Sequence, residues 1–270
     1  MIKRIAIITG GSSGIGEAIA YTLSENGYKV YATSRNPKKE KENDAFIFLK
    51  MDVRDDASVK DAIKKVIEDE GRIDVLINCA GLGLNGPIEE TPIEMIKDVF
   101  ETNFFGIVRT TQSVLPHMRE VKTGFIINIS SFAGEFGLPL RGYYSASKAA
   151  VEMFTEALRM EVKNFNVRVS IVQPGDFATN ISANRPTATL TADSAYKDIF
   201  DKINDQVNSE MIEAADPSVL GEEILKILNK KSPQVRYRIG PFIQKLSVQV
   251  KKIVSGKIFE TIIMNHYNIR

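Results

Sequence analysis

A tyrosine and a lysine four residues apart form the pair in this sequence best suited to proton transfer. Tyr144 and Lys148 lie in the stretch Tyr-Ser-Ala-Ser-Lys, within a segment whose apolar residues recur at helical spacing. Residues four apart share a face of a helix, so the phenol and the ammonium group would lie side by side. A nearby cation lowers the pKa of a phenol, so that the group can give up and take back a proton nearer to neutral pH. The pair therefore predicts acid–base chemistry on one helix.

A glycine-rich loop near the start of the chain has the composition of a phosphate-binding turn. It runs from Thr9 to Gly16, between a short apolar strand and a helix. Glycine lets the backbone approach a pyrophosphate closely, and the first amides of the helix donate to the anion. A strand–loop–helix unit of this kind is typical of a dinucleotide site. The residues expected to contact the cofactor are Gly10, Ser12, Ser13, Gly14, Ile15 and Gly16.

Both features are positioned by an alternation of short β-branched runs and longer helical stretches. Strands are expected at 5–9, 29–33, 46–51, 75–78, 125–130 and 167–172, and helices at about 15–25, 57–70, 93–118 and 143–163. Strands that are apolar on both faces and alternate with helices indicate a parallel sheet covered on both sides. The sequence thus predicts an α/β fold, a Rossmann-like doubly wound parallel sheet of about seven strands with helices on both faces. We expect one domain over residues 1–270, with an insertion over the site at about 177–216.

The glycine loop and the Tyr–Lys pair together resemble the short-chain dehydrogenase/reductase family. The loop reads T-G-x-x-x-G-I-G and the pair reads Y-x-x-x-K. The resemblance spans roughly residues 3 to 180. It implies hydride transfer between a nicotinamide cofactor and a carbonyl or secondary alcohol, with Tyr144 exchanging the proton on oxygen. The catalytic residues that it implies are Asn103, Ser131, Tyr144 and Lys148.

The resemblance also implies a role for each of the other catalytic residues. Ser131, 13 positions before the tyrosine, would donate to the carbonyl oxygen and stabilise the developing alkoxide. Asn103 would hold a water molecule beside the lysine in a proton relay. Lys148 would also bind the hydroxyls of the nicotinamide ribose. The neighbouring Ser130 and Tyr143 do not fit the family spacing, and we expect Tyr143 to be a substrate-side or packing aromatic.

Short segments after the other strands are assigned to the cofactor by the same resemblance. In an open parallel sheet, ligands bind beyond the carboxyl ends of the strands. Cys79, which lies in one of these segments, is expected to be a small packed residue rather than a nucleophile. Further cofactor contacts are expected at Asp52, Val53, Asn78, Ala80, Gly81, Tyr144, Lys148, Pro174, Gly175, Phe177 and Thr179.

The end of the second strand indicates which nicotinamide cofactor is bound. An acidic residue usually holds a free ribose 2′-hydroxyl at this position. Here the strand is followed by Ser34, Arg35 and Asn36, with no carboxylate. A guanidinium group forms charge-assisted bonds to phosphate oxygens, so Ser34 and Arg35 predict NADP(H), with NADPH preferred over NADH. A solvated surface arginine is the alternative interpretation.

The composition argues against several other classes of protein. A formal net charge of +1 gives no reason to expect nucleic acid as a partner. With one cysteine and two histidines far apart in the sequence, we expect no disulfide framework and no metal site. We also expect no signal peptide and no membrane-spanning helix, which favours a cytoplasmic location. A non-catalytic NADPH-binding sensor is the rival class, although such proteins usually lack the tyrosine or the lysine.

The substrate and the partners are indicated by apolar residues near the site and in the tail. Phe132, Phe136 and Leu138 favour an apolar or bulky carbonyl or alcohol substrate, and the chain resembles family members that act on steroids, retinoids or keto lipids. The segment 241–270 is basic and amphipathic. Peripheral contact with an anionic membrane, a cover over the pocket and a subunit contact are all open interpretations of it. The resemblance implies a homodimer or homotetramer.

Overall fold

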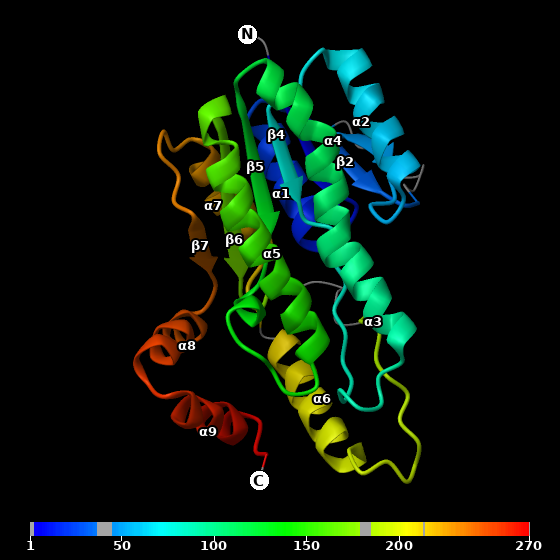
Figure 1. The fold of residues 1–270 in the computed structure, drawn as a ribbon, viewed down its shortest axis with the longest axis vertical. Helices are drawn as coiled ribbons and strands as arrows, with labels where there is room; N and C mark the ends of the chain where they lie inside the picture. Colours follow the sequence, from blue (N-terminus) through cyan, green and yellow to red (C-terminus); the bar gives the residue numbers. More distant parts are fainter. Residues whose placement is uncertain (1–2, 37–44, 179–184, 213, 270) are drawn as a thin grey trace.

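A parallel β-sheet forms the centre of the protein (Figure 1). The computed structural model describes residues 3–36, 45–178, 185–212 and 214–269. Within this part of the chain the sheet has seven strands in the order β3-β2-β1-β4-β5-β6-β7, and every neighbouring pair is parallel. The strands are β1 Arg4–Thr9, β2 Tyr28–Ser34, β3 Ile47–Lys50, β4 Val75–Asn78, β5 Gly124–Ile129, β6 Val167–Pro174 and β7 Arg236–Ile239.

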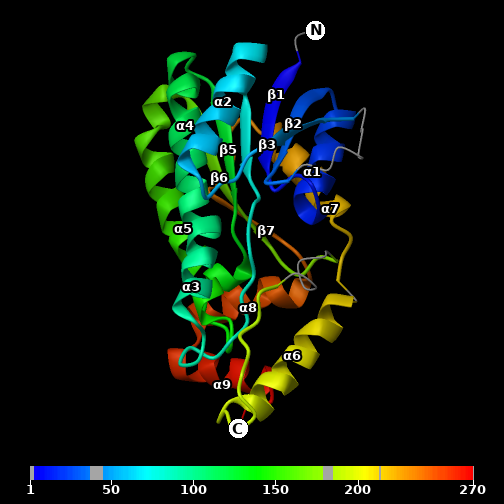
Figure 2. The same cartoon turned by 90° about the vertical axis from the view of Figure 1, so that its right-hand side faces the viewer.

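Helices cover both faces of the sheet (Figure 2). On one face α1 and α7 lie together, and their apolar side chains share one core with the strands. On the other face α2, α4 and α5 form a second core against the sheet. These helices are α1 Gly14–Glu25, α2 Asp56–Glu70, α4 Gly106–Glu120, α5 Gly142–Glu161 and α7 Ser218–Leu228. The doubly wound α/β fold expected from the sequence is confirmed.

The expected strands and helices are observed to within a few residues, apart from one helix that is divided. The helices Lys197–Ile212 and Ser218–Leu228 were not expected. The strand Arg236–Ile239 had no expected position, because its alternating arginines give no apolar run. The helix expected over 93–118 is divided into α3 Ile93–Phe100, a π-helical turn η1 Glu101–Phe105, and α4. A π turn locally widens a helix and is frequent at functional sites. Here it carries Asn103.

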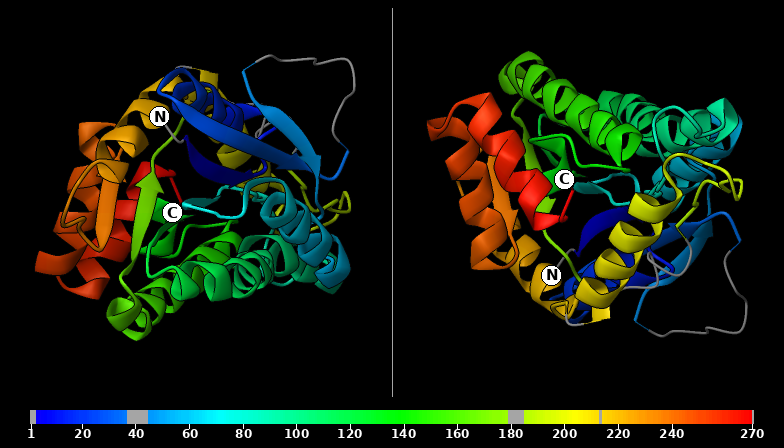
Figure 3. Two further views of the ribbon diagram at one scale, coloured as in Figure 1. Left: turned by 90° about the horizontal axis from the view of Figure 1, so that it is seen from above. Right: turned by 90° about the horizontal axis from the view of Figure 1, so that it is seen from below.

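A further group of helices lies beyond the carboxyl ends of the strands (Figure 3). Helix α6 Lys197–Ile212 lies on one side of this end, and α8 Phe242–Ile253 and α9 Gly256–His266 lie on the other. A small apolar cluster joins α6 to the last residues of the chain through Ile203 and Tyr267. Among the helices that the structure describes, none has the length and apolar character needed to cross a bilayer.

Candidate active site

The expected acid–base pair lies on the first turns of α5. Tyr144 is half-buried, whereas Lys148 is buried. The ammonium nitrogen of Lys148 donates to the carbonyl oxygen of Ile129, at the end of β5, over 3.0 Å. The same nitrogen lies 5.9 Å from the centre of the Tyr144 ring. The Ile129 carbonyl thus holds the ammonium group of Lys148 beside the ring of Tyr144.

Asn103 links the end of β4 to the catalytic helix. Its side chain is fully buried, and its Oδ1 accepts from the backbone amide of Leu82 at 2.7 Å. Its Nδ2 donates to the Leu82 carbonyl oxygen at 2.9 Å and to Ser147 Oγ at 3.0 Å. The Ser147 hydroxyl in turn donates to the carbonyl oxygen of Tyr144 at 2.7 Å. The Asn103 amide therefore positions the loop after β4 against the turn of α5 that carries the tyrosine.

Ser131 lies directly after β5, at the start of a short 3-10 turn, η2 Phe132–Gly134. Its Oγ accepts from the backbone amide of Ala133 at 3.2 Å. Because the serine oxygen is the acceptor in this bond, its own O–H remains able to donate to a substrate oxygen. The bond to Ala133 fixes where that hydroxyl lies.

The two neighbours that did not fit the family spacing make different contacts. The hydroxyl of Ser130 is buried and donates to the carbonyl oxygen of Lys148 at 3.3 Å. The phenol of Tyr143 donates to the carbonyl oxygen of Ile88 at 2.9 Å. The hydroxyl protons of Ser130 and Tyr143 are therefore both donated to backbone carbonyl oxygens. This distinguishes the two residues from Ser131 and Tyr144.

The glycine loop between β1 and α1 is shaped to receive an anion. Gly10 has φ of +67°, and a Cβ there would lie 2.9 Å from the Cα of Ala80. A Cβ on Gly16 would lie 2.3 Å from the carbonyl oxygen of Gly10. Among the described residues, the side chain of Ser13 makes no capping bond to the first amides of α1, so these donors are left for a ligand. The loop fits the pyrophosphate of a dinucleotide on these grounds.

Thr9 joins this loop to the end of β4. Its hydroxyl oxygen accepts from the backbone amides of Cys79 and Ala80, both at 2.9 Å. Gly81 follows, and a Cβ there would meet Asn103 Oδ1 at 3.4 Å and Lys148 Nζ at 3.6 Å. The glycine loop and Lys148 are therefore connected through one short segment, residues 79–81.

Arg35 and Asp52 lie near each other, beyond the ends of β2 and β3. Arg35 is exposed directly after β2. The pKa of Asp52 is lowered, chiefly by its hydrogen bond with Arg54, and the charge of Arg35 contributes. Arg54 bonds the Asp52 carboxylate at 3.0 Å. Val53 is buried and packs against Gly106 of α4. Among the described residues, the Asp52 carboxylate is thus paired with Arg54, and the Arg35 side chain is exposed.

Two of the expected cofactor contacts have their side chains in the core. Asn78 donates to Asn128 Oδ1 at 2.8 Å and accepts from Thr110 at 2.7 Å. Phe177 is 3% exposed and packs in the core beside α1 and α7. The side chains of both residues therefore contact other parts of the protein.

Cys79, Pro174 and Gly175 also lie at this edge of the sheet. Burial raises the pKa of the Cys79 thiol to about 12, which leaves it protonated and agrees with a packed residue. Pro174 ends β6, and the amide of Gly175 donates to Ile239 of β7 at 2.8 Å. Thr179 lies outside the described residues.

One residue near the tyrosine was missed in the sequence. Arg185 is half-buried, and a Cβ on Gly83 would lie 2.9 Å from its Cγ. Burial lowers the pKa of Arg185, and the charge of Arg141 lowers it further. The nearby Tyr144 raises it. Its position in the insertion expected over the site was the one feature of the sequence that could have indicated it. An arginine in an irregular loop belongs to no helical or strand periodicity.

Comparisons with known proteins agree with this geometry. The sequence model of a family described as short chain dehydrogenase matches residues 4–189. A 3-ketodihydrosphingosine reductase of Bacteroides thetaiotaomicron is 41% identical over 272 residues, covering 100% of both chains. A short-chain dehydrogenase crystal structure from Streptomyces avermitilis has a TM-score of 0.81 at 30% identity, covering 93% of this chain and 94% of that one. The closed form of a serine dehydrogenase complexed with NADP+ has a TM-score of 0.76 at 28% identity, covering 88% and 95%.

The matched region contains the glycine loop, Asn103, Ser131, Tyr144 and Lys148. It therefore includes both motifs from which the resemblance was drawn, and the relatives extend the similarity over nearly the whole chain. The chain belongs to the short-chain dehydrogenase/reductase family, the NAD(P)-dependent oxidoreductases that act on CH–OH and C=O groups.

Proposed function

We propose that the protein transfers a hydride between NADP(H) and the carbonyl carbon of an apolar, lipid-like substrate. The observation that carries the proposal is the bond from Lys148 to the carbonyl oxygen of Ile129, which holds the helix of Tyr144 and Lys148 against the end of β5, two residues before Ser131. The nicotinamide supplies the hydride when bound. In reduction Tyr144 gives its phenolic proton to the carbonyl oxygen, and in oxidation it takes the proton back. Ser131 donates a hydrogen bond to the same oxygen.

The remaining polar residues hold these groups in place. Lys148 keeps a positive charge beside the phenol and binds the nicotinamide ribose. Asn103 fixes the turn of α5 that carries Tyr144. It also holds the bound water molecule of the proposed proton relay. The amides after Gly10 and at the start of α1 bind the pyrophosphate.

An apolar substrate is supported by the segment between Ser131 and Tyr144. Phe136 packs edge-to-face on Phe259 of α9, with ring centres 5.1 Å apart. Leu138 and Leu140 pack against the cluster that joins α6 to the end of the chain. The region next to the tyrosine is thus bordered by apolar side chains from three parts of the sequence. The relative named as a 3-ketodihydrosphingosine reductase matches along its full length, which supports a long-chain keto lipid.

A panel of carbonyl compounds tests the substrate class. We expect NADPH oxidation with 3-ketodihydrosphingosine, and weaker turnover with ketosteroids and retinal. A short, polar ketone such as hydroxyacetone is the control and should be turned over far more slowly, because it buries little apolar surface. Faster turnover of the polar ketone than of every lipid-like compound would contradict the substrate class.

We propose that Arg35 selects NADPH over NADH. Its charge-assisted bonds to the 2′-phosphate are worth about 1.5–3 kcal/mol, so Arg35→Ala is expected to weaken NADPH binding roughly 10- to 100-fold. NADH lacks the phosphate and serves as the internal control, with its dissociation constant unchanged. Titration of both cofactors by nucleotide fluorescence measures the two effects. An unchanged NADPH to NADH ratio in the variant would rule out the assignment.

We also propose that α8 and α9 contact the surface of an anionic membrane. Phe242, Leu246 and Ile253 share one face of α8 and are 75%, 46% and 83% exposed. Val248, on the opposite face, is buried. Exposed lysines border the apolar face, an arrangement that favours anionic lipid headgroups. These lysines are Lys245, Lys252 and Lys257.

Liposome sedimentation tests the membrane contact. The variant Phe242→Glu with Ile253→Glu is expected to lose most binding to phosphatidylglycerol vesicles, because two charges replace side chains of the apolar face of α8 that are 75% and 83% exposed. Val121→Glu with Phe165→Glu is the matched control, at exposed apolar positions near the amino ends of the strands. Equal binding by both variants, or none by the unchanged protein, would contradict the contact.

We propose a homodimer or homotetramer formed through α5. Met153 and Met160 lie seven residues apart on its outer face and are 61% and 72% exposed. A second copy of the chain would cover this apolar face. Light scattering at assay concentration should give a mass of two or four chains; the mass of one chain would contradict the proposal.

A further inference from the structure

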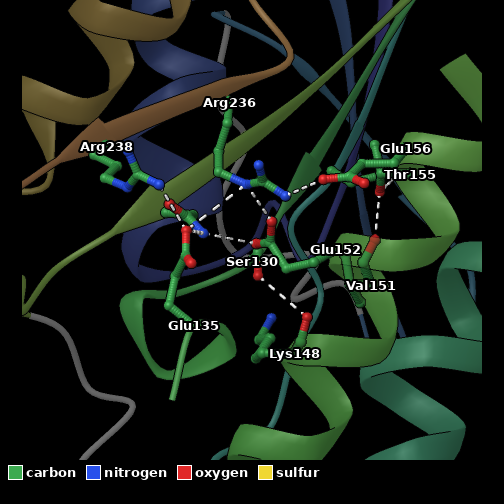
Figure 4. Close-up of polar contacts among 11 residues, drawn as sticks. Ser130, Glu135, Lys148, Val151, Glu152, Thr155, Glu156, Arg236 and Arg238 are labelled. Atoms are coloured by element: carbon green, nitrogen blue, oxygen red, sulfur yellow. Dashed lines mark hydrogen bonds and ion pairs between the residues drawn. The ribbon is translucent and has the colours of Figure 1, made fainter. Parts of the chain in front are cut away.

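A chain of polar and charged side chains, some buried and some half-buried, runs along α5 (Figure 4). Arg238 bonds the carboxylate of Glu135 at 2.7 Å. The side-chain amide of Gln173 donates to Glu135 at 2.9 Å and to Glu152 at 3.1 Å. Arg236 bonds Glu152 at 2.7 Å and continues to Glu156 on the next turn of α5. The groups form one continuous line from the loop after β5 to the middle of α5.

The members of this chain come from the elements that carry the catalytic groups. Glu135 follows the η2 turn and lies four residues after Ser131. Glu152 lies four residues after Lys148, on the following turn of α5. The two arginines belong to β7, far along the sequence. β7 is thus bonded to both the serine turn and the lysine helix.

Stability alone is a poor reason for this arrangement. Glu152 is 3% exposed, and burying charges costs free energy that a well-packed apolar group would not. Gln173 Oε1 and Arg238 Nε are buried and have no hydrogen-bond partner among the described residues. Burial alone would raise the pKa of Glu135, but the bonds from Arg238 and Gln173 hold it below its ordinary value. The carboxylate is therefore charged at neutral pH, and the bonds to it are directional.

The η2 turn is the element that most needs an external support. It is three residues long, and a Cβ on Gly134 would lie 3.0 Å from Ser130 Oγ and 3.1 Å from the carbonyl carbon of Lys148. Glu135 ends the turn, and its backbone carbonyl also accepts from Lys251 of α8. The position of the turn against α5 is thus set through Glu135 by residues of the C-terminal segment.

We propose that Arg238 and Glu135 are positioning residues that hold the Ser131 hydroxyl in register with Tyr144. This inference rests on the proposed function. A hydrogen-bond donor aimed at a developing alkoxide must lie about 3 Å from it, and a displacement of 1 Å can lower the rate about 100-fold. Arg238 acts through Ser131 and does not itself touch the substrate.

A double-mutant cycle between Arg238 and Ser131 tests the proposal. Arg238→Met is expected to lower kcat roughly 10- to 100-fold, with the dissociation constant of NADPH unchanged. In a Ser131→Ala background the same change should lower kcat no more than about twofold, because the hydroxyl it positions is gone. Arg238→Lys should recover part of the loss. The substrate is the panel compound turned over fastest.

Two further variants separate positioning from general stability. Arg168→Met removes another half-buried arginine of the same sheet, near the amino end of β6, and should leave kcat unchanged. Glu135→Gln keeps the shape of the carboxyl group. If Arg238→Met does not fold, the double-mutant cycle with Ser131→Ala is measured with Glu135→Gln in its place. Losses that multiply across the two positions, or an unchanged kcat in Arg238→Met, would overturn the inference. Absence of turnover in the unchanged protein would instead overturn the proposed function.

Discussion

Replacing Tyr144 with phenylalanine is expected to lower kcat for carbonyl reduction by about 10²- to 10⁴-fold, the usual contribution of a general acid. The variant keeps the ring beside Lys148 but loses the proton that the carbonyl oxygen receives. NADPH should still bind, weakened at most about fivefold, since one neutral hydrogen bond is worth about 1 kcal/mol. Single-turnover oxidation of bound NADPH measures the first effect, and nucleotide fluorescence measures the second.

Tyr143→Phe is the matched control for this experiment. It removes the same hydroxyl from the adjacent residue, where the phenol bonds the carbonyl oxygen of Ile88. We expect kcat within about twofold of the unchanged protein, the range of substitutions away from a specific site. Equal turnover by Tyr144→Phe and the unchanged protein would remove the tyrosine from the mechanism.

Gly16→Ala should abolish binding of NADPH and of NADH alike. The added Cβ would lie 2.3 Å from the carbonyl oxygen of Gly10 and 2.8 Å from its carbonyl carbon. Both atoms are backbone, so the loop itself must move, and the amides that face the pyrophosphate move with it. Isothermal titration calorimetry should show no heat of binding, while circular dichroism shows that the helices are retained.

Gly256→Ala adds the same methyl group where it meets no described atom within 4 Å, at the first residue of α9. Cofactor binding should be unchanged in this control. Retained NADPH affinity in Gly16→Ala would show that the loop tolerates the methyl group and would contradict the assignment of the pyrophosphate to it.

The parts of the site that can be predicted from the sequence are those whose residues lie close together along the chain. The glycine loop lies within eight residues, and Tyr144 and Lys148 share one turn of a helix. The fold can be predicted from the regular alternation of short apolar runs and helical stretches along the chain. Each of these features depends on the spacing of residue types along the chain, which can be read directly from a single sequence.

The parts that do not follow from the sequence depend on contacts between distant segments. Arg238 meets Glu135 only because β7 pairs with β6, and β7 itself has no apolar run to indicate it. Asn103 lies in a π turn and bonds Ser147 of α5, and neither the turn nor the bond has a signal in the sequence. The side chain of Phe177, which the resemblance assigns to the cofactor, packs in the core with side chains from distant segments.

Transfer of deuterium from the cofactor to the product tests the central claim most directly. NADPH carrying deuterium at both C4 positions would be incubated with the enzyme and 3-ketodihydrosphingosine, and the product examined by mass spectrometry. The proposed function predicts one deuterium on the carbinol carbon, with transfer lost in Tyr144→Phe and retained in Tyr143→Phe. Product without deuterium, or no product from any carbonyl compound of the panel, would contradict hydride transfer from NADPH at this site.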